Sequence, residues 1–542
     1  MRIRLTLALL FGLSLAMQAP AKSVKSSSYD ALLTLFADWR AFEQPPQREG
    51  APDYTAARFE AAYALLPSYQ TRLRVIDRSG WSAAEQVDWA LIEAEMHGFD
   101  FNHRVLKPWV RDPAFYQTLF MEQSDVPAHE GPTHHATLEV WQYAFPLDAA
   151  GQARMAKELS VIPSLLTQAR ENLTGNARDL WIAGIRNIEQ QRRDLDTLET
   201  LIGGSGTPSI TANLSAAREA TDAFAEWLKQ QSKNKTGPSG VGKDNYTWYQ
   251  QHVHRVPLTW QQEVDLLQRE LDRAWSSLKL EEQRNRDLPP LVAANTPEEF
   301  AALTNKAVGR MMAFLRTKAI MPIKPNMEPA LRAQMGAFVP EAERNFFAIG
   351  LHYDPLPLYS HFYHWFELAQ IRDEPHTSPI RRGPLLYNIW DSRMEGMATG
   401  VEEMFMHAGL YTDSPRSREI VWIMLAQRAA RGLGSLYAHA NEMTMEQASQ
   451  VHVRWTPRRW MQREPELLKF EQHLYLRQPG YGTSYVVGKY LLERLLARAI
   501  EQKEAANQPF VLRDFFQQVN DIGCIPVTLV EQEMLGTGAV AP

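Results

Sequence analysis

Apolar residues recur at intervals of three and four along almost the whole chain, which is the period of one face of an α-helix. The segment SAAEQVDWALIEAEMHGF, residues 82–99, shows this pattern clearly. Alternating strand patterns bounded by Asn-Gly or Asp-Gly turns are nearly absent. The pattern therefore predicts an all-α protein with at most a small β-hairpin.

Helix starts are marked by capping residues. Ser82 is followed three residues later by Glu85, the spacing of a capping box in which each side chain accepts a hydrogen bond from the other residue's backbone N–H. Comparable start signals occur at Thr259, Thr296, Ser414 and Thr444, and the second and third of these precede a proline. We expect a helix to begin directly after each position.

Two stretches rich in glycine, serine and proline interrupt the helical pattern, at residues 203–209 and 232–245. Composition does not change across them, and a chain of 542 residues is long enough to bury a large core. We expect residues 22–542 to form a single large helical domain, or two lobes separated by the loop near 232–245.

The N-terminus has the layout of a secretory signal peptide. Arg2 and Arg4 precede an apolar run of about a dozen residues, and Ala19-Pro20-Ala21 follows it. Residues 1–21 therefore predict a periplasmic or secreted protein, with an uncleaved N-terminal anchor as the alternative. No later segment has the roughly 18 apolar residues of a membrane span, so we expect no membrane contact after cleavage.

Composition narrows the classes of partner and cofactor. Cys524 is the single cysteine, which excludes an internal disulfide, and its IGCIPV setting predicts a protonated, inert thiol. The net charge is -6 and there is no basic stripe, so we expect no nucleic-acid partner.

The segment SRMEGMATGVEEMF, residues 392–405, carries carboxylates among methionines, glycines and alanine. Glu395 and Glu402 are seven residues apart, so on a helix both lie on one face. Apolar surroundings would raise the pKa values of these carboxyls unless a cation or hydrogen-bond donors compensate. The alternatives are a functional site and a solvated glutamate stripe whose methionines fill the core.

Upstream, YSHFYHWFELAQ contains His361, His364 and Glu367 at steps of three. Imidazole and carboxylate groups are zinc ligands, and Glu395 from a second helix would complete a tetrahedral set. The H-E-x-x-H signature of zinc peptidases is missing, however. The alternative is that these histidines belong to an aromatic core or to the surface.

Four segments in order resemble a known family. EGMATGVEEMFMHAGLY from Glu395 resembles the EGWALYAE...LGLY segment of the bacterial domain-of-unknown-function family eight-eight-five. QRAARGLGSLYAHANEMTMEQA, RQPGYGTSYVVGKYLLERLLARA and PFVLRDFF...IGCIPVTLV resemble its RAARLVVDTGLH, PGQALSYKIG and closing F-x-L-x-x-F-H...G-x-x-P segments. Members are similar to zincin-type zinc peptidases and carry an HExxPGH-like segment ahead of EGWALYAE.

The resemblance implies an exported, zincin-like, metallopeptidase-type helical domain with a central cleft. It places Glu395 at the third metal-ligand position. Tyr485 and His439 become candidate catalytic residues that hold substrate or stabilise an oxyanion. Glu402 and Arg477 become candidates for the wall of the substrate cleft.

The chain also departs from the family pattern. The HExxPGH-like segment is degenerate, since only His361, His364 and Glu367 lie near its expected place, and no general base is evident. Met397 replaces the tryptophan of EGWALYAE, and Tyr481 replaces the glutamine of PGQA. We therefore expect a degraded metal site, holding no cofactor or a divalent metal, with zinc the candidate.

The leading functional prediction is an exported protein that binds a peptide or similar ligand in its cleft without the usual zinc-dependent hydrolysis. The first alternative is an active, divergent metal-dependent peptidase of carboxypeptidase or dipeptidase type. The second is a helical scaffold that binds another protein.

Overall fold

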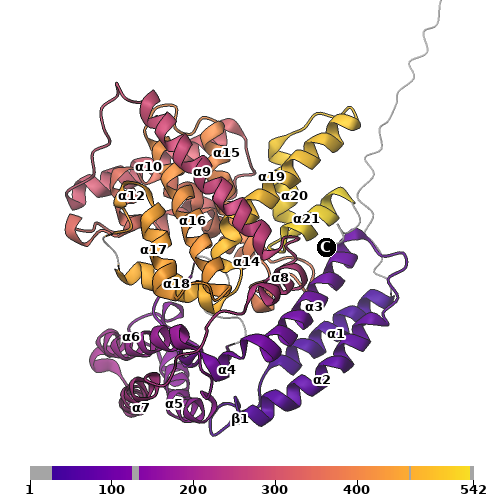
Figure 1. Cartoon of the computed structure of the whole chain (residues 1–542), viewed down its shortest axis with the longest axis vertical. Coiled ribbons are helices and arrows are strands. Elements are labelled where there is room, and N and C mark those ends of the chain that lie inside the picture. Colours follow the sequence, from indigo (N-terminus) through magenta and orange to yellow (C-terminus); the bar gives the residue numbers. More distant parts are fainter. Residues whose placement is uncertain (1–26, 125–133, 463–464, 537–542) are drawn as a thin grey trace, which may run out of the picture.

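The computed structural model describes residues 27–124, 134–462 and 465–536. Within these ranges the chain is built from α-helices and two pairs of two-residue strands, so the predicted all-α class is confirmed (Figure 1). The predicted signal peptide, residues 1–21, lies outside the described residues.

Residues 27–232 form two groups of helices. The N-terminal group contains α1 (Ser27–Glu43), α2 (Ala56–Arg74), α3 (Ala83–Phe101), the π-helical turn η1 (Asn102–Leu106), α4 (Pro108–Arg111) and the 3-10 helix η2 (Pro113–Tyr116). The second group contains η3 (Val140–Gln142), α5 (Ala149–Asn172), α6 (Arg178–Ile202), η4 (Gly203–Ser205) and α7 (Pro208–Ser232). The glycine-rich stretch at 203–209 is thus the short connection between α6 and α7.

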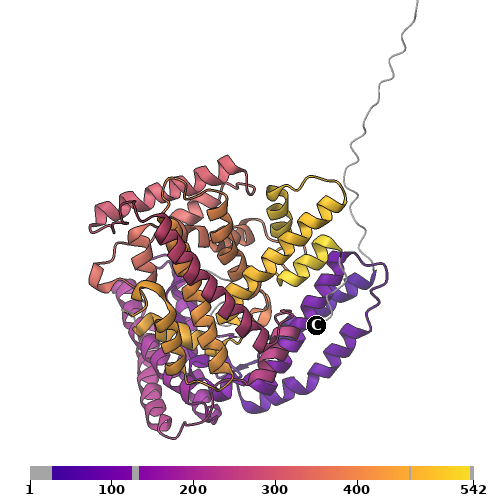
Figure 2. The same cartoon turned by 45° about the horizontal axis from the view of Figure 1, so that its top comes forward.

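The remaining helices form the third and largest group. They are α8 (Lys243–His252), α9 (Trp260–Arg284), α10 (Pro297–Lys318), α11 (Met327–Ala333), η5 (Glu341–Glu343), α12 (Phe346–Tyr353), α13 (Leu356–His361), α14 (Tyr363–Asp373), η6 (Leu386–Asn388), α15 (Asp391–His407), α16 (Ser417–His439), α17 (Met445–Trp455), η7 (Pro457–Arg459), α18 (Pro465–Arg477), α19 (Tyr481–Ala505), α20 (Leu512–Ile522) and α21 (Val527–Leu535). α9 packs along α16 and runs diagonally across this group (Figure 2).

The strands are minor elements. β1 (Gln47–Arg48) and β2 (Ala51–Pro52) form an antiparallel hairpin, in agreement with the prediction. β3 (Leu119–Phe120) and β4 (Leu138–Glu139) form a parallel pair in which Leu119 faces Leu138. The hydrophobic pattern gave no indication of this second pair, since two residues are too few to show a period.

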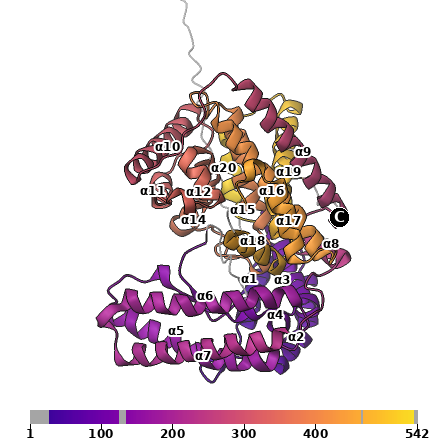
Figure 3. The same cartoon turned by 60° about the vertical axis from the view of Figure 1, so that its left-hand side comes forward.

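The described residues form two large hydrophobic cores and a small third cluster, in which side chains of α6, α16, α17 and α18 meet. The smaller core holds α5, α6 and α7, which form a separate layer beneath the rest (Figure 3). The larger core holds α1 to α3 together with helices from α8 to α21. Residues 233–242 carry the chain from the smaller core into the larger one, within the stretch predicted to separate the lobes. The lobes are therefore not consecutive halves, because the first three helices pack with the last.

α15 and α19 approach each other closely at the centre of the larger core. Gly396 on α15 faces Gly488 on α19, and a Cβ on either glycine would overlap backbone atoms of the opposite helix. The small residues noted in SRMEGMATGVEEMF thus bring two helix backbones into contact, which holds Glu395 at a fixed distance from α19.

The beginning and the end of the chain are joined by a buried ion pair. Arg381, which is buried, lies with Nε 2.6 Å from Asp88 Oδ1 on α3 and with Nη1 2.7 Å from Glu533 Oε2 on α21. α21 also packs directly on α3 (Figure 1).

Most predicted helix starts are confirmed. Ser82, Thr259 and Thr444 each form a complete capping box at the start of α3, α9 and α17. Thr296 caps α10, with Pro297 in the first turn.

The start predicted at Ser414 is wrong, because α16 begins three residues later at Ser417. Ser414 lies in a turn, where its carbonyl accepts from the Ser417 N–H at 2.9 Å. Its hydroxyl accepts from Arg310 Nη2 at 2.9 Å instead of capping a helix.

Candidate functional site

A break between two short helices brings the two histidines together. α13 ends at His361, and α14 begins at Tyr363. Phe362 lies between them with φ -65° and ψ 15°, which departs from helical geometry. The imidazole ring centroids of His361 and His364 consequently lie 4.9 Å apart and are nearly perpendicular, at 84°.

Both histidines face Glu395 on α15. His364 Nε2 lies 3.1 Å from Glu395 Oε2, and His361 Nε2 lies 3.7 Å from the same oxygen. One donor atom from each of the three residues lies within 4.8 Å of the others, and all three residues are buried. A tetrahedral zinc ion with ligands at about 2.0–2.2 Å requires neighbouring donors roughly 3.3–3.6 Å apart. The two separations from Glu395 Oε2, 3.1 and 3.7 Å, lie close to this range, so the structure brings His361, His364 and Glu395 together.

Glu402 lies behind His361 and does not line a substrate cleft, contrary to its predicted place. Its Oε1 is 2.9 Å from His361 Nδ1, and the side chain is only 2% exposed. Arg428 on α16 binds both carboxylate oxygens, at 2.6 and 2.7 Å. A carboxylate on the far nitrogen fixes the tautomer and ring orientation of a metal-binding histidine. Glu402 thus directs His361 Nε2 towards Glu395.

The charges in the cluster favour a cation. Burial lowers the pKa of His361, and Arg428 lowers it further, so this imidazole is neutral near pH 7. Its Nδ1 lies 2.9 Å from Glu402 Oε1, and its Nε2 faces the Glu395 carboxylate at 3.7 Å. Burial alone would raise the pKa of Glu395, but His364, His361 and Tyr481 hold it well below its usual range. Two imidazoles and a carboxylate that converge in this way form a donor set that suits a divalent cation.

Aromatic and cationic side chains from α16 and α19 close the cluster on one side. Tyr485, a predicted cleft residue, has its ring 6.2 Å from that of His361, in a stacked arrangement. The Arg431 guanidinium lies over the Tyr485 ring, 4.0 Å from its centroid, and pairs with Glu471 at 2.5 Å. Tyr485 is therefore a neighbour of the predicted ligands, in agreement with its expected position.

Tyr481 is a site residue that the sequence did not reveal. Its hydroxyl donates to Glu395 Oε1 at 2.5 Å and so occupies the oxygen that does not face the histidines. The sequence showed only that a tyrosine replaces the glutamine of PGQA. The feature of the sequence that could have identified Tyr481 as a site residue is its position directly after Pro479-Gly480, at the first residue of α19.

Glu367, predicted as a further ligand, does not join the three-donor cluster. Its Oε1 lies 2.6 Å from Arg393 Nη1, and both side chains are buried. Burial nonetheless keeps the pKa of the Glu367 carboxyl above its usual value. The described cationic partner of Glu367 is thus an arginine on the neighbouring helix α15 and not a metal ion.

His439, predicted as a polar cleft residue, is fully buried at the end of α16. Its Nε2 donates to the Tyr475 carbonyl at 2.8 Å, and its ring lies 5.5 Å from that of Tyr246. Burial lowers the pKa of His439 to about 4. Its described contacts are those of a neutral residue that joins α16 to α18 and α8.

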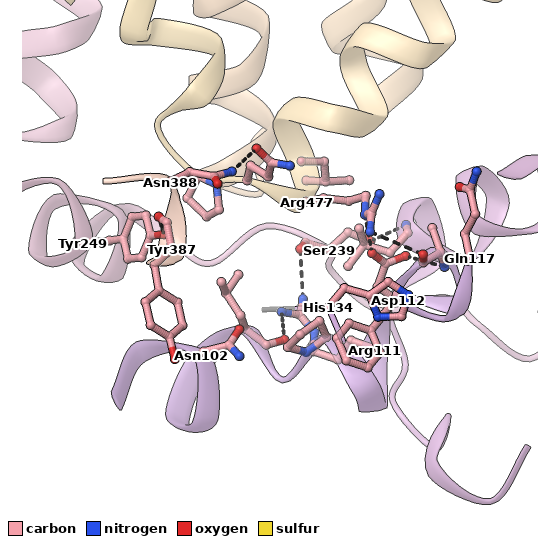
Figure 4. A pocket seen from close by; sticks show the side chains of 18 of the residues that line it. Asn102, Arg111, Asp112, Gln117, His134, Ser239, Tyr249, Tyr387, Asn388 and Arg477 are labelled. Atoms are coloured by element: carbon pink, nitrogen blue, oxygen red, sulfur yellow. Dashed lines mark hydrogen bonds and ion pairs between the residues drawn. The ribbon is translucent and has the colours of Figure 1, made fainter. Parts of the chain in front are cut away.

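Arg477, the other predicted cleft residue, lines a pocket of about 100 Å³ between the N-terminal helices and the third group. Its Nε donates to Asp112 Oδ2 at 2.7 Å. Asn388 and Arg477 reach the pocket from the third group, while Asn102, Arg111 and Asp112 reach it from the N-terminal group (Figure 4). This pocket is the candidate ligand cleft.

Comparisons with known proteins agree with the motif resemblance. Residues 364–534, which include His364 and Glu395, match the family model described as "Bacterial protein of unknown function (DUF885)". The family resemblance read from the sequence motifs is thereby confirmed for this region of the chain.

Solved structures share the fold over nearly the whole chain. A candidate lipoprotein of unknown function from Shewanella oneidensis matches with a TM-score of 0.68 and 15% identity, covering 94% of this chain and 100% of that one. A candidate lipoprotein from Colwellia psychrerythraea matches with a TM-score of 0.62 and 13% identity, covering 94% and 97%. At such identities the likeness shows the fold alone.

Among curated proteins, none matches the chain significantly. Within the described ranges, no helix combines the length and the apolar character that crossing a membrane requires.

Proposed function

We propose that this chain is an exported protein that holds a divalent metal ion on His361, His364 and Glu395 and binds a peptide-like ligand without rapid hydrolysis. The observation that carries the proposal is the convergence of these three donors on one point, with Glu402 orienting His361. The match of residues 364–534 to a bacterial family adds support, because it includes two of the three donors.

The donor set fits zinc. Two imidazoles and one carboxylate are the protein ligands of many catalytic zinc sites, and the carboxylate behind His361 is the outer support that such sites use. A zinc ion bound there would supply a Lewis acid for polarising a carbonyl oxygen. Likeness to the zincin peptidases is part of this proposal. The arrangement differs from theirs in one respect, because the two histidines come from α13 and α14 and not from a single H-E-x-x-H helix.

Slow hydrolysis follows from the state of the neighbouring carboxylates. Glu402 is held by Arg428, and Glu367 is held by Arg393, so each already has a cationic partner. Neither is free to remove a proton from a water molecule near the cluster. A missing general base lowers the rate of such a reaction by roughly 10²–10⁴-fold.

An active metal-dependent peptidase is the second candidate, and one observation favours it. Tyr485 lies next to His361, with the Arg431 guanidinium over its ring. A phenol and a guanidinium beside a metal site are suitable for holding the oxygen of a carbonyl as negative charge develops on it.

Export is supported by two features. Residues 1–21 have the layout of a signal peptide, with basic residues before an apolar run. The two structural neighbours are themselves described as candidate lipoproteins, a class of exported proteins. We therefore propose a periplasmic or secreted location.

Metal analysis of the purified full-length chain tests the proposal. We expect one zinc ion per chain by elemental analysis, lost in His364→Ala and in Glu395→Ala. Glu367→Gln is the matched control, since Glu367 lies outside the cluster, and it should retain zinc. A wild-type chain that takes up no zinc, or equal loss in all three variants, would contradict the proposal.

A peptide library then separates the two candidates. The binding proposal expects no cleavage by the zinc-loaded chain on the timescale of a typical peptidase assay. Cleavage that a chelator abolishes and added zinc restores would establish the peptidase instead.

A further inference from the structure

The candidate cleft contains a buried carboxyl group that the metal cluster does not use. Asp391 is the first residue of α15, one helical turn before Glu395, and it lines the pocket beside Asn388. Its side chain is 0% exposed, and neither carboxyl oxygen has a hydrogen-bond partner among the described residues. Buried carboxyl oxygens in folded proteins nearly always have a partner.

The free-energy cost of burying the unpartnered Asp391 carboxyl is smaller when this carboxyl is protonated and neutral. Burial raises the pKa of the Asp391 carboxyl well above its usual range, and the negative charge of Glu395 adds to the effect. A cationic group that entered the pocket would favour the ionised form of Asp391. It would form a charge-assisted hydrogen bond with this carboxylate.

Aromatic rings accompany Asp391 in the pocket wall. Tyr249 and Tyr387 lie side by side there, and the Tyr249 hydroxyl donates to the Tyr387 carbonyl at 3.0 Å (Figure 4). Asp391 and Tyr249 both line this pocket. A carboxylate next to aromatic faces is the kind of environment that favours an ammonium group.

The part of the pocket that is lined by Arg111, Asp112 and Arg477 carries the opposite charge. Arg111 and Arg477 contribute two guanidinium groups, and Asp112 contributes one carboxylate, which pairs with Arg477. Arg111 donates to the Ser239 carbonyl at 2.9 Å, and none of its described contacts is an ion pair. One positive charge on this wall is therefore not balanced within the pocket.

The two histidines of the pocket do not change this balance. Burial lowers the pKa values of His134 and His254 to about 3, so both rings are neutral near pH 7. They offer hydrogen-bonding nitrogen atoms without charge.

We infer that the pocket binds a small zwitterion, a free amino acid or a dipeptide, with its ammonium group at Asp391 and its carboxylate group at Arg111 and Arg477. A free volume of about 100 Å³ suits such a short ligand and not an extended polypeptide. The inference rests on the proposed peptide-like ligand and narrows it to the class in which both termini are free.

Calorimetric titration of the full-length chain with L-alanyl-L-alanine tests the inference. Acetylating the amine or amidating the carboxylate of the dipeptide should each weaken binding about tenfold or more, because each removes one charge-assisted hydrogen bond. In Asp391→Asn the free and acetylated dipeptides should bind alike. In Arg111→Met the difference in affinity between the free and amidated dipeptides should be smaller than in wild type, with Arg477 as the remaining guanidinium. The exposed aspartate of α9 provides the control Asp265→Asn, which should behave as wild type.

Three results would overturn the inference. The first is no binding of the free dipeptide at millimolar concentration, and the second is equal binding of the free, acetylated and amidated dipeptides to wild type. The third is that Asp391→Asn still prefers the free dipeptide to the acetylated one as strongly as wild type does. Zinc content measured on the same samples keeps this test separate from that of the proposed function. Asp391→Asn should retain its zinc, so loss of dipeptide binding with zinc present concerns the pocket alone. Replacing an unpartnered carboxyl by an isosteric amide should leave the fold intact, which the thermal midpoint checks.

Discussion

Gly396 on α15 and Gly488 on α19 lie backbone against backbone, and no side chain separates the two helices at this point. The contact places Glu395, the residue before Gly396, within reach of Tyr481 at the start of α19. The candidate metal cluster and the tyrosines beside it therefore depend on a contact made by two residues that have no functional side chain.

Gly488→Ala should destabilise the protein and disturb the cluster. The added Cβ would overlap the Ser392 carbonyl oxygen and Gly396 Cα, so α15 and α19 must separate. We expect the free energy of unfolding to fall by about 1–3 kcal/mol or more, measured by denaturant titration, with weaker zinc binding. Gly309→Ala on α10 is the control, since a Cβ there meets no atom within 4 Å, and it should be neutral or slightly stabilising.

Glu402→Gln should weaken metal binding without removing a ligand. The amide retains a hydrogen bond to Arg428 but loses the charge that orients His361. We expect zinc affinity, measured by competition with a coloured chelator, to fall by roughly 10–100-fold.

Glu403→Gln is the matched control for this change. Glu403 is the next residue on α15 and binds Arg273 at 2.7 and 2.8 Å, away from the histidines. An equal loss of affinity in both variants would show that Glu402 acts only through the stability of α15.

Glu263 on α9 should make stability depend on pH. Burial raises the pKa of this carboxyl from 4.5 to about 7, although Thr483 and Tyr246 donate hydrogen bonds to it. The folded chain therefore holds a proton that the unfolded chain releases, so the stabilisation is complete below pH 4.5 and is lost as the pH rises through 7.

The corresponding measurement is the free energy of unfolding of wild type and Glu263→Gln from pH 4.5 to 8. Relative to the variant, wild type should lose about 3 kcal/mol over this range, at 1.36 kcal/mol per pKa unit. Parallel pH profiles for the two proteins would contradict the raised pKa.

Cys524 should resist alkylation in the folded protein. Burial, with Glu367 as a further contribution, raises the pKa of the thiol from 9.0 to about 12, which lowers the thiolate fraction roughly 1,000-fold. Mass spectrometry after treatment with iodoacetamide at pH 8 should find the folded chain unmodified and the denatured chain fully modified. Cys524 is partly exposed, so rapid modification of the folded chain would contradict the raised pKa of the thiol.

Much of the fold could be predicted from the sequence because its determinants are local. Three capping boxes act over four residues each, and the helical period is visible within single segments. The helix start predicted at Ser414 is wrong because Arg310, which is distant along the chain, donates a hydrogen bond to the serine hydroxyl. The parallel strand pair was missed because each of its strands has only two residues.

The sequence singled out the three residues of the candidate cluster but not the contacts around them. His361, His364 and Glu395 stand out by residue type and by the family resemblance. The sequence does not show that Arg393 pairs with Glu367, or that Arg428 pairs with Glu402, since these contacts join different helices. Nor does it show that Phe362 breaks the helix and turns the two histidines towards one carboxylate.

The link from Asp88 through Arg381 to Glu533 also sets the order in which the molecule can be completed. Helix α3 is made before Arg381, its ionic partner, and long before α21, the helix that packs on it. Domains usually fold as they are synthesised, from the N-terminus onward. Here the larger core stays incomplete until α21 has been added, because α3 packs against that helix.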